Sequence, residues 1–273
     1  GSQIATLMLL FVVVLVVLEH FSRRRRRYYQ QTTSRFRTLP CYDLQGLRAL
    51  LAIVVCAIPV LVGFIIPVII LVRLSIYYFS DSWTPHFQEL AINSLLLSGA
   101  AAAISVGVAL FINYSRRLQG GPLLLVLTRI ASLGYAIPGA VLAVGILIPF
   151  AAFDNALDAL LRQRFGISSG LLLSGTVIAV LFAYIVRFLM VAVGQIESSL
   201  DKVSLSVDMA ARTLGYRAGE TMIRYHIPLI RGGLLTALMI VFVDCMKELP
   251  ATLLLRPFGF ETLATHIYHY ASD

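Results

Sequence analysis

The stretch Leu90–Ile112, LAINSLLLSGAAAAISVGVALFI, is an uncharged run long enough to decide the fold class of this chain. A helix rises about 1.5 Å per residue, so roughly 20 residues cross the ~30 Å hydrocarbon core of a bilayer. Two other uncharged runs, Ala49–Val72 and Ile130–Phe153, reach the same length. All three runs are continuous rather than alternating, which favours helices over the strands of a membrane barrel, since such strands need only about 10 residues.

Three further apolar runs are shorter or contain charged residues. They are Ile4–Leu18, Gly170–Val193 with Arg187, and Leu229–Leu255 with Asp244, Lys247 and Glu248. The composition agrees with six spans, because 59% of the residues are hydrophobic and only 13% are charged. The sequence therefore predicts an all-α integral membrane protein, a polytopic bundle of about six transmembrane helices.

Basic residues orient the predicted spans, because lysine and arginine accumulate in cytoplasmic loops. Fifteen of the 22 lie in three alternate segments, Ser22–Arg48, Tyr114–Pro122 and Gly194–Arg231. The other connecting segments, Ile76–Glu89, Asp154–Ser169 and the residues after Leu254, hold three. We expect the N-terminal end of this sequence on the periplasmic side, the loop 197–228 in the cytoplasm and the C-terminal end outside.

The five arginines Arg23–Arg27 follow the first span, whereas a secretory signal has its positive charge before the apolar stretch. Beside a membrane span such a run sets topology and meets anionic lipid, so no nucleic-acid partner is implied. We interpret residues 1–21 as the last helix of a preceding membrane module and residues 22–46 as a basic cytoplasmic linker. Residues 47–273 then form a second module of five spans, from which we expect a final helix to be missing.

Catalytic and metal-binding patterns are weak. Cys41, Cys56 and Cys245 lack the spacing of a metal site, and two of them fall within apolar runs, so disulfides are not expected. His266 and His269 share a helix face at a spacing that suits a metal, but a lone pair of this kind is more often an interfacial polar patch. No nucleophile or carboxylate pair stands out. We predict no enzyme activity, no fixed metal and no bound cofactor.

Prolines and small residues within the runs have two readings. Pro59, Pro67, Pro138 and Pro149 are expected to kink or interrupt their helices. Gly134 and Gly139 permit close helix packing, as do the small residues Gly99–Ala103, Ala136, Ala140 and Gly145. Ordinary packing accounts for most of these positions, and they indicate a transporter only in aggregate.

The last span contains three charged residues. Asp244 lies near the bilayer midplane if the span begins at Gly232 and Gly233, and Lys247 and Glu248 follow at helical spacing on the same face. Charges at that depth cost several kcal/mol unless they are paired or face water. They mark a substrate pathway, or else an ion pair of Lys247 with one carboxylate that holds helices together. Arg187 is a further possible partner.

A polar segment interrupts the apolar runs on the cytoplasmic side. It contains Asp208-Met-Ala-Ala-Arg-Thr-Leu-Gly215, with Pro228 thirteen residues later. Such a polar segment is energetically costly in a membrane bundle unless a partner on the aqueous side binds it. We therefore interpret it as a docking surface.

Ala210, Ala211, Gly215 and Pro228, at these spacings, resemble the EAA loop of ABC-transporter permease subunits. The resemblance implies a type I importer fold and a short coupling helix, Ser204–Leu214, that docks into an ATPase subunit. The two alanines would remove bulk in a cleft, and Gly215 would end the helix. Met209 stands where the motif has glutamate, and the acid is one place earlier, at Asp208. Asp208 therefore substitutes for it, or that contact is absent.

The stretch Lys247–Tyr268 is similar to the corresponding part of ferric-iron import permeases, which are fused pairs of membrane modules. This resemblance implies a second permease module in the same polypeptide, a periplasmic binding protein, and a dimer of ATPase subunits that hydrolyse ATP at a bacterial inner membrane. The sequence itself has no Gly-Lys dipeptide and thus no Walker A phosphate loop.

Ferric iron prefers oxygen ligands, so the candidate contacts on the pathway are Asp244, Glu248, Glu261 and Tyr268. Permeases for phosphonate or thiamine are also similar, and an anionic substrate group would use Lys247 and Arg256 instead. A membrane scaffold without transport would explain the packing and the charge asymmetry but not the spacing of the alanines, glycine and proline. A membrane-embedded enzyme would need a nucleophile or a metal cluster, and the sequence offers neither in an identifiable form.

Overall fold

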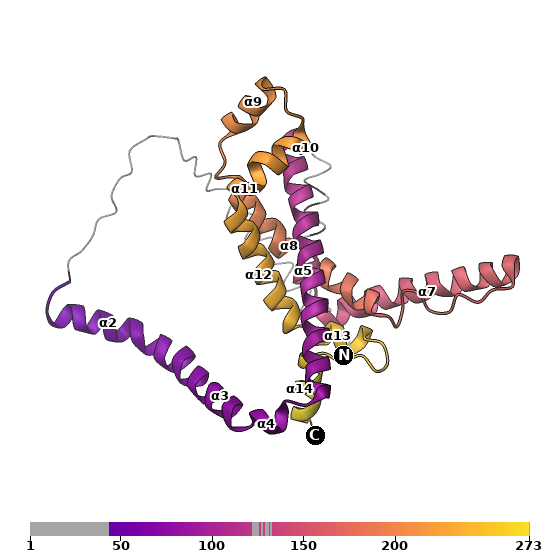
Figure 1. The fold of residues 1–273 in the computed structure, drawn as a ribbon, viewed down its shortest axis with the longest axis horizontal. Helices are drawn as coiled ribbons and strands as arrows, with labels where there is room; N and C mark the ends of the chain where they lie inside the picture. The colour runs from indigo at the N-terminus through magenta and orange to yellow at the C-terminus, as the bar shows by residue number, and fades with distance from the viewer. Residues whose placement is uncertain (1–43, 122–125, 127, 129–130, 132, 273) are drawn as a thin grey trace. The chain divides into compact units, whose positions relative to one another are not determined.

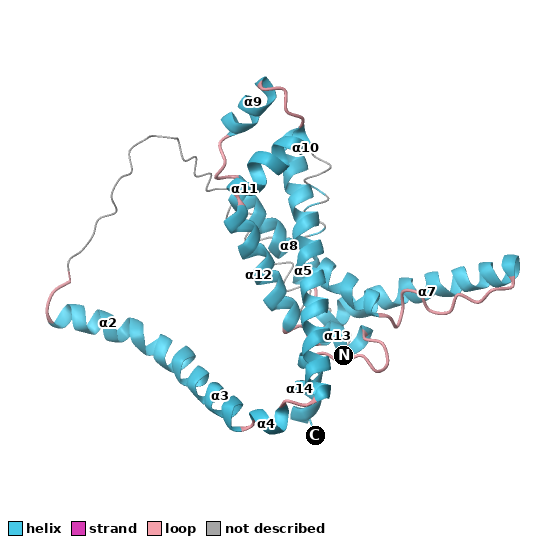
Figure 2. Cartoon of the chain, viewed as in Figure 1, coloured by secondary structure: helices cyan, strands magenta, loops and turns pink. Residues whose placement is uncertain are grey.

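The computed structural model describes residues 44–121, 126, 128, 131 and 133–272, and the regular elements among them are helices (Figures 1 and 2). The predicted span Ile4–Leu18, the basic linker up to residue 43 and Cys41 lie outside the described residues. The described residues fall into two compact units, residues 44–88 and 89–272.

The first unit contains one long helix with a wide π-helical turn inside it, and a short helix that follows after a turn at Tyr78. Its elements are α2 (Leu47–Val60), the π-helical segment η1 (Leu61–Ile65), α3 (Ile66–Tyr77) and α4 (Phe79–Ser82). Pro59 lacks a donor and crowds the preceding turn, yet it does not end the helix, because the chain widens into η1 just after it. Pro67 lies in the first turn of α3. The predicted span Ala49–Val72 therefore continues as one span over Leu47–Tyr77.

The second unit is a helix bundle around a core of small and apolar side chains. Its long helices are α5 (Pro85–Gln119, which enters this unit at Glu89), α7 (Gly139–Phe165), α8 (Val177–Leu200) and α12 (Arg231–Met246). One face of α5 is buried along its length, at Leu90, Ser94, Leu97, Ala101, Ala102, Ser105, Ala109 and Asn113. These spacings of three and four residues make one helical stripe, and its small side chains let neighbouring backbones approach closely.

Shorter helices lie at the two ends of this bundle, with α5 running between them (Figure 1). At one end, which we call the α9 end, lie α9 (Leu205–Thr213) and α10 (Ala218–Thr221). At the other, the α14 end, lie α13 (Pro250–Leu255) and α14 (Leu263–Ser272). The π-helical segment η2 (Met222–His226) and α11 (Ile227–Leu229) join α10 to α12.

The predicted span Ile130–Phe153 is wrong in both boundaries. The chain leaves the helical conformation at Ile137 and Pro138, and α7 begins only at Gly139. Pro138 favours this break, because proline lacks the N–H donor that a continuous helix needs. α7 then continues to Phe165, through residues that were expected in the outside loop Asp154–Ser169. Pro149 lies inside α7 without ending it.

The predicted span Gly170–Val193 begins seven residues too early, because the buried carboxylate of Asp154 holds the preceding residues in a loop. The backbone N–H groups of Leu173 and Ser174 donate to this carboxylate over 3.1 and 2.8 Å, and the Ser174 hydroxyl donates over 2.6 Å. The helix α8 therefore starts at Val177 and extends to Leu200.

The predicted continuous span Leu229–Leu255 is also wrong, because the chain breaks twice within it. The segments Ala218–Leu229 and Arg231–Met246 meet at an angle of 78°. α12 then ends at Met246, which lies four residues before Pro250. A proline ring clashes with the carbonyl of the residue four positions before it, so the helix cannot continue regularly through Pro250. Lys247 and Glu248 consequently lie in a break between two helices and not on one helical face with Asp244.

Four helices among the described residues are long and apolar enough to cross a membrane, and the bent pair makes a fifth if it counts as one span. The sixth predicted span lies outside the described residues. The chain is therefore an all-α polytopic membrane protein, as its sequence predicts.

Glycines mark the close approaches to α8. A methyl group on Gly134 would overlap the backbone of Val186, and one on Gly233 would overlap Ser199. One on Gly139 would lie 2.6 and 2.7 Å from the side chains of Glu248 and Arg187. Two other small positions singled out from the sequence, Gly99 and Gly145, face open space instead.

The neighbouring glycines at the start of α12 give a matched pair for testing this packing. Gly233→Ala should lower the free energy of unfolding by about 1–3 kcal/mol, because the added methyl group forces α8 and α12 apart at Ser199. Gly232→Ala should cause no loss, since a methyl group there meets nothing within 4 Å. Unfolding of the purified protein in detergent measures both, and equal effects would contradict this packing.

Candidate functional site

The polar segment between α8 and α12 folds into a short, well-capped helix. The hydroxyl of Ser204 accepts a hydrogen bond from the backbone N–H of Ser206, and Ser204 is the N-cap of α9. At the other end, Gly215 has a φ of 83°, and the N–H groups of Gly215 and Tyr216 donate to the carbonyls of Arg212 and Ala211. This is a Schellman ending, which favours glycine. The helix expected over Ser204–Leu214 is thus present as Leu205–Thr213.

α9 has an inner and an outer face. Ala211 is buried against the rest of the chain, whereas Ala210 is exposed, so only Ala210 lies where a partner could be met. Leu205, Met209 and Leu214 have exposed fractions of 64%, 61% and 71%. We call these three side chains the α9 apolar face. An amphipathic helix that turns apolar side chains toward water has the character of a docking surface.

Asp208 faces inward and is fully engaged within the chain. One carboxylate oxygen lies 2.8 Å from Arg117 of α5 and the other lies 2.7 Å from Nε2 of His226 in η2. Burial raises the pKa of Asp208, but the hydrogen bonds from Arg117 and His226 outweigh it and hold the pKa below its ordinary value. The carboxylate thus does not take the outer position, which Met209 occupies.

Arg117 was not singled out from the sequence, where it counts only as one of two basic residues at the end of a span. Its guanidinium also donates to the carbonyls of Leu200, Val203 and Ser204, over 2.6, 2.8 and 3.3 Å. These carbonyls belong to the end of α8 and the turn that leads into α9. One side chain therefore fixes the backbone on the N-terminal side of α9 as well as Asp208 within it.

Two neighbours complete the cluster around Asp208. The Tyr114 hydroxyl, one turn before Arg117, donates to the carbonyl of Ala218 over 2.7 Å. Its ring packs against His226, with the ring centroids 5.3 Å apart. His226 itself is fully buried. The exposed Pro228 lies in α11, immediately before the bend into α12.

The three charged residues of the last span separate into two ion pairs. Lys247 reaches Asp244 over 2.7 Å, and 71% of the lysine side chain is exposed. Glu248 turns away to Arg187 of α8, whose Nε lies 3.1 Å from the carboxylate, and the glutamate side chain is only 7% exposed. Lys247 therefore pairs with Asp244, and Glu248, the carboxylate that it does not reach, pairs with Arg187.

The pair of Arg187 and Glu248 is built into the packing of several elements. Arg187 also donates to the carbonyl of Ile137, just before α7. The backbone N–H of Ala251 donates to Glu248 over 3.3 Å, and the carbonyl of Glu248 accepts from Thr252. The missing side chain at Gly139 leaves the space that both charged groups fill.

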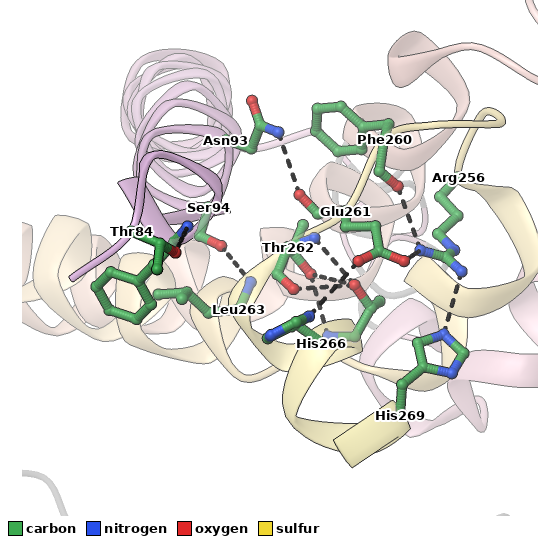
Figure 3. A network of polar contacts seen from close by, with 12 residues as sticks. Thr84, Asn93, Ser94, Arg256, Phe260, Glu261, Thr262, Leu263, His266 and His269 are labelled. Carbon is green, nitrogen blue, oxygen red and sulfur yellow. Dashed lines mark hydrogen bonds and ion pairs between the residues drawn. The ribbon is translucent and has the colours of Figure 1, made fainter. Parts of the chain in front are cut away.

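Glu261 lies in the loop between α13 and α14, at the centre of a polar network (Figure 3). Arg256 donates to Glu261 over 2.7 Å and to His269 over 3.2 Å, while His266 approaches the other carboxylate oxygen at 3.7 Å. The Arg256 hydrogen bond holds the pKa of Glu261 below its ordinary value. His266 and His269 thus engage different partners and do not converge as a pair. Tyr268 is exposed on α14.

Comparison with known proteins adds a family resemblance to this geometry. The chain matches no protein-family model. Over 181 residues, 66% of its length, it is 26% identical to the Fe(3+)-transport system permease protein FbpB 2 of Haemophilus influenzae. Over 83% of its length it is 25% identical to the putative ferric transport system permease protein FbpB 1 of the same organism. This chain is similar to ferric-iron transport permeases. It spans 33% and 37% of these two permeases, so it corresponds to part of them.

The buried pair Arg187–Glu248 gives a test of stability. Arg187→Met should lower the free energy of unfolding by about 3–5 kcal/mol, because it leaves the Glu248 carboxylate buried without its partner. Arg187→Met with Glu248→Gln should recover most of the loss. Lys247→Met, which removes a lysine whose side chain is largely exposed, should cost less than Arg187→Met. Unfolding in detergent measures all three, and similar losses for the Arg187 and Lys247 variants would contradict this assignment.

The cluster around Asp208 predicts a loss of stability in acid. Because the folded-state pKa lies below the unfolded value, the contribution of Asp208 is complete above about pH 4 and is lost as the pH falls through the lower, folded-state pKa. In Asp208→Asn, the melting temperature should therefore fall less steeply with acid than in the parent. Asp81→Asn, at an exposed carboxylate of α4, is the control. The same pH profile for Asp208→Asn and the parent would refute this expectation.

Proposed function

We propose that this chain is the membrane-spanning permease part of an ABC importer and moves ferric iron by ATP-driven alternating access. The similarity to ferric-iron transport permeases, one of them over 83% of the chain, carries the proposal. The all-α polytopic fold and the capped helix α9 support it. In this mechanism the site opens to one side of the membrane at a time, and ATP hydrolysis drives the change.

α9 is the proposed contact with an ABC ATPase subunit. Its exposed apolar face and its rigid caps suit a helix that docks as a preformed unit, because little conformational entropy is then lost on binding. Met209 fills the outer position with a flexible apolar side chain, so this contact relies on shape and buried apolar surface. ATP hydrolysis then belongs to the partner, and this chain binds no cofactor of its own.

The remaining partners follow from the same proposal. A dimer of ATPase subunits binds at the α9 end, in the cytoplasm, and a periplasmic binding protein delivers iron at the α14 end. A second permease module of the same polypeptide completes the pathway. The chain resides in the bacterial inner membrane.

Glu261 and Tyr268 are the proposed first contacts for iron, since carboxylate and phenolic oxygens are hard ligands at the α14 end. Asp244 and Glu248 lie further along the pathway but are paired with Lys247 and Arg187. Iron therefore displaces a cation from a carboxylate at each step. An anionic substrate such as a phosphonate would instead meet the exposed Lys247 and the half-buried Arg256.

Reconstitution of the complete transporter with its ATPase and binding protein tests this function. The binding protein loaded with ferric iron should stimulate ATP hydrolysis and the uptake of radioactive iron, and phosphonate or thiamine should do neither. Met209→Asp should abolish both activities and the co-purification of the ATPase, because it places a charge on the α9 apolar face. Ile223→Asp, at an exposed apolar residue of η2, is the matched control and should retain them.

Three outcomes would overturn the proposal. A permease with which no ATPase subunit co-purifies is not part of an ABC importer. Stimulation by phosphonate or thiamine alone would show the alternative substrate. Equal loss of ATPase binding in the Met209 and Ile223 variants would show that α9 is not the specific contact.

A further inference from the structure

α5 is a straight route between the two ends of the bundle. It runs from Pro85 to Gln119 without an internal proline, since Pro85 is its first residue. From Asn93 to Arg117 it rises through 24 residues, which at 1.5 Å each is about 36 Å, more than the hydrocarbon thickness of a bilayer. Both of these residues make hydrogen bonds to other segments of the second unit.

At the α9 end, side chains of α5 donate hydrogen bonds to backbone carbonyls as well as to a side chain. Arg117 binds the carbonyls of Leu200, Val203 and Ser204, and the Tyr114 hydroxyl binds the carbonyl of Ala218. The acceptors therefore lie on both sides of α9 in the sequence. A displacement of α9 carries these carbonyls with it and pulls on the last turns of α5.

At the α14 end, α5 again holds main-chain atoms, as Figure 3 shows. The Asn93 amide donates to the carbonyl of Glu261 over 3.2 Å, and the buried Ser94 hydroxyl accepts from the N–H of Leu263 over 2.8 Å. These two bonds bracket Thr262. They attach α5 to the loop that carries Glu261 and Arg256.

The route through the covalent chain is less rigid. Between α9 and the Glu261 loop it turns through 78° before α12, and it breaks again between Met246 and Pro250. α8 is also continuous, and its ion pair from Arg187 and its buried hydrogen bond from Tyr184 lead to Glu248 and Thr252. Among the described helices, α5 makes hydrogen bonds to both of these segments.

We propose that α5 transmits the displacement of α9 to the Glu261 loop, and that Arg117 at one end and Asn93 with Ser94 at the other are its points of attachment. This inference rests on the proposed function, because it needs an ATPase to move α9. It makes Arg117 a positioning residue for transport, acting through the helix and not through contact with iron. A rigid element that is hydrogen-bonded at both ends can carry energetic coupling of this kind, and α5 is such an element.

The test follows the Glu261 loop directly, in the complete transporter in lipid nanodiscs. A thiol at the fully exposed Phe258, introduced as Phe258→Cys, reports the accessibility of this loop through its rate of maleimide labelling. In the parent, trapping the ATPase with ATP and vanadate should change this rate. With Arg117→Ala, or with Asn93→Ala and Ser94→Ala together, the nucleotide-dependent change should be lost, while ATPase binding persists.

Arg116→Ala is the matched control. Arg116 is the neighbour of Arg117 but pairs with Glu197 of α8, so the change in labelling should remain. Arg117→Lys should restore part of the response, because lysine keeps the charge beside Asp208 but cannot reach all the carbonyls. A variant at either end that keeps the full response refutes transmission through α5. If the parent itself binds no ATPase or shows no response, the proposed function fails instead.

Discussion

A charged side chain among apolar helices costs several kcal/mol unless an opposite charge meets it, and the pair Arg187–Glu248 is where this constraint shapes the bundle most. The pair joins α8 to the break between α12 and α13. It also sets the residue at the start of α7, since only glycine at 139 leaves room for both groups. A charged break of this kind is tolerated at membrane depth because neighbouring helices satisfy its polar atoms.

The local features of α9 follow from the sequence alone. Its N-cap serine, its terminating glycine and the spacing of apolar residues each act within a few residues, so they predict the helix almost to its ends. The break at Pro250 is equally local, because a proline blocks the carbonyl four residues earlier. Hydropathy gives Leu229–Leu255 as one span only because it ignores this backbone rule.

The partners of the charged residues do not follow from the sequence. Arg116 and Arg117 are adjacent and chemically alike, yet Arg116 forms a half-buried pair with Glu197, whereas Arg117 binds Asp208 and three carbonyls. Which of them faces inward depends on the rotation of α5 against α8, a tertiary fact. The same holds for Glu248, whose choice of Arg187 over Lys247 depends on the break after Met246.

The replacement of the motif glutamate by Met209 fits the division of α9 into two faces. The Asp208 carboxylate faces the interior, where Arg117 and His226 each bind one of its oxygens. This carboxylate is therefore not free to contact a partner. The outer face offers Leu205, Met209 and Leu214 instead, and full burial of a side chain of this size contributes about 1.5–3 kcal/mol. Binding through such a surface would depend on shape and little on salt. The charge in this segment therefore positions the helix, and the apolar side chains are the ones left for the proposed contact.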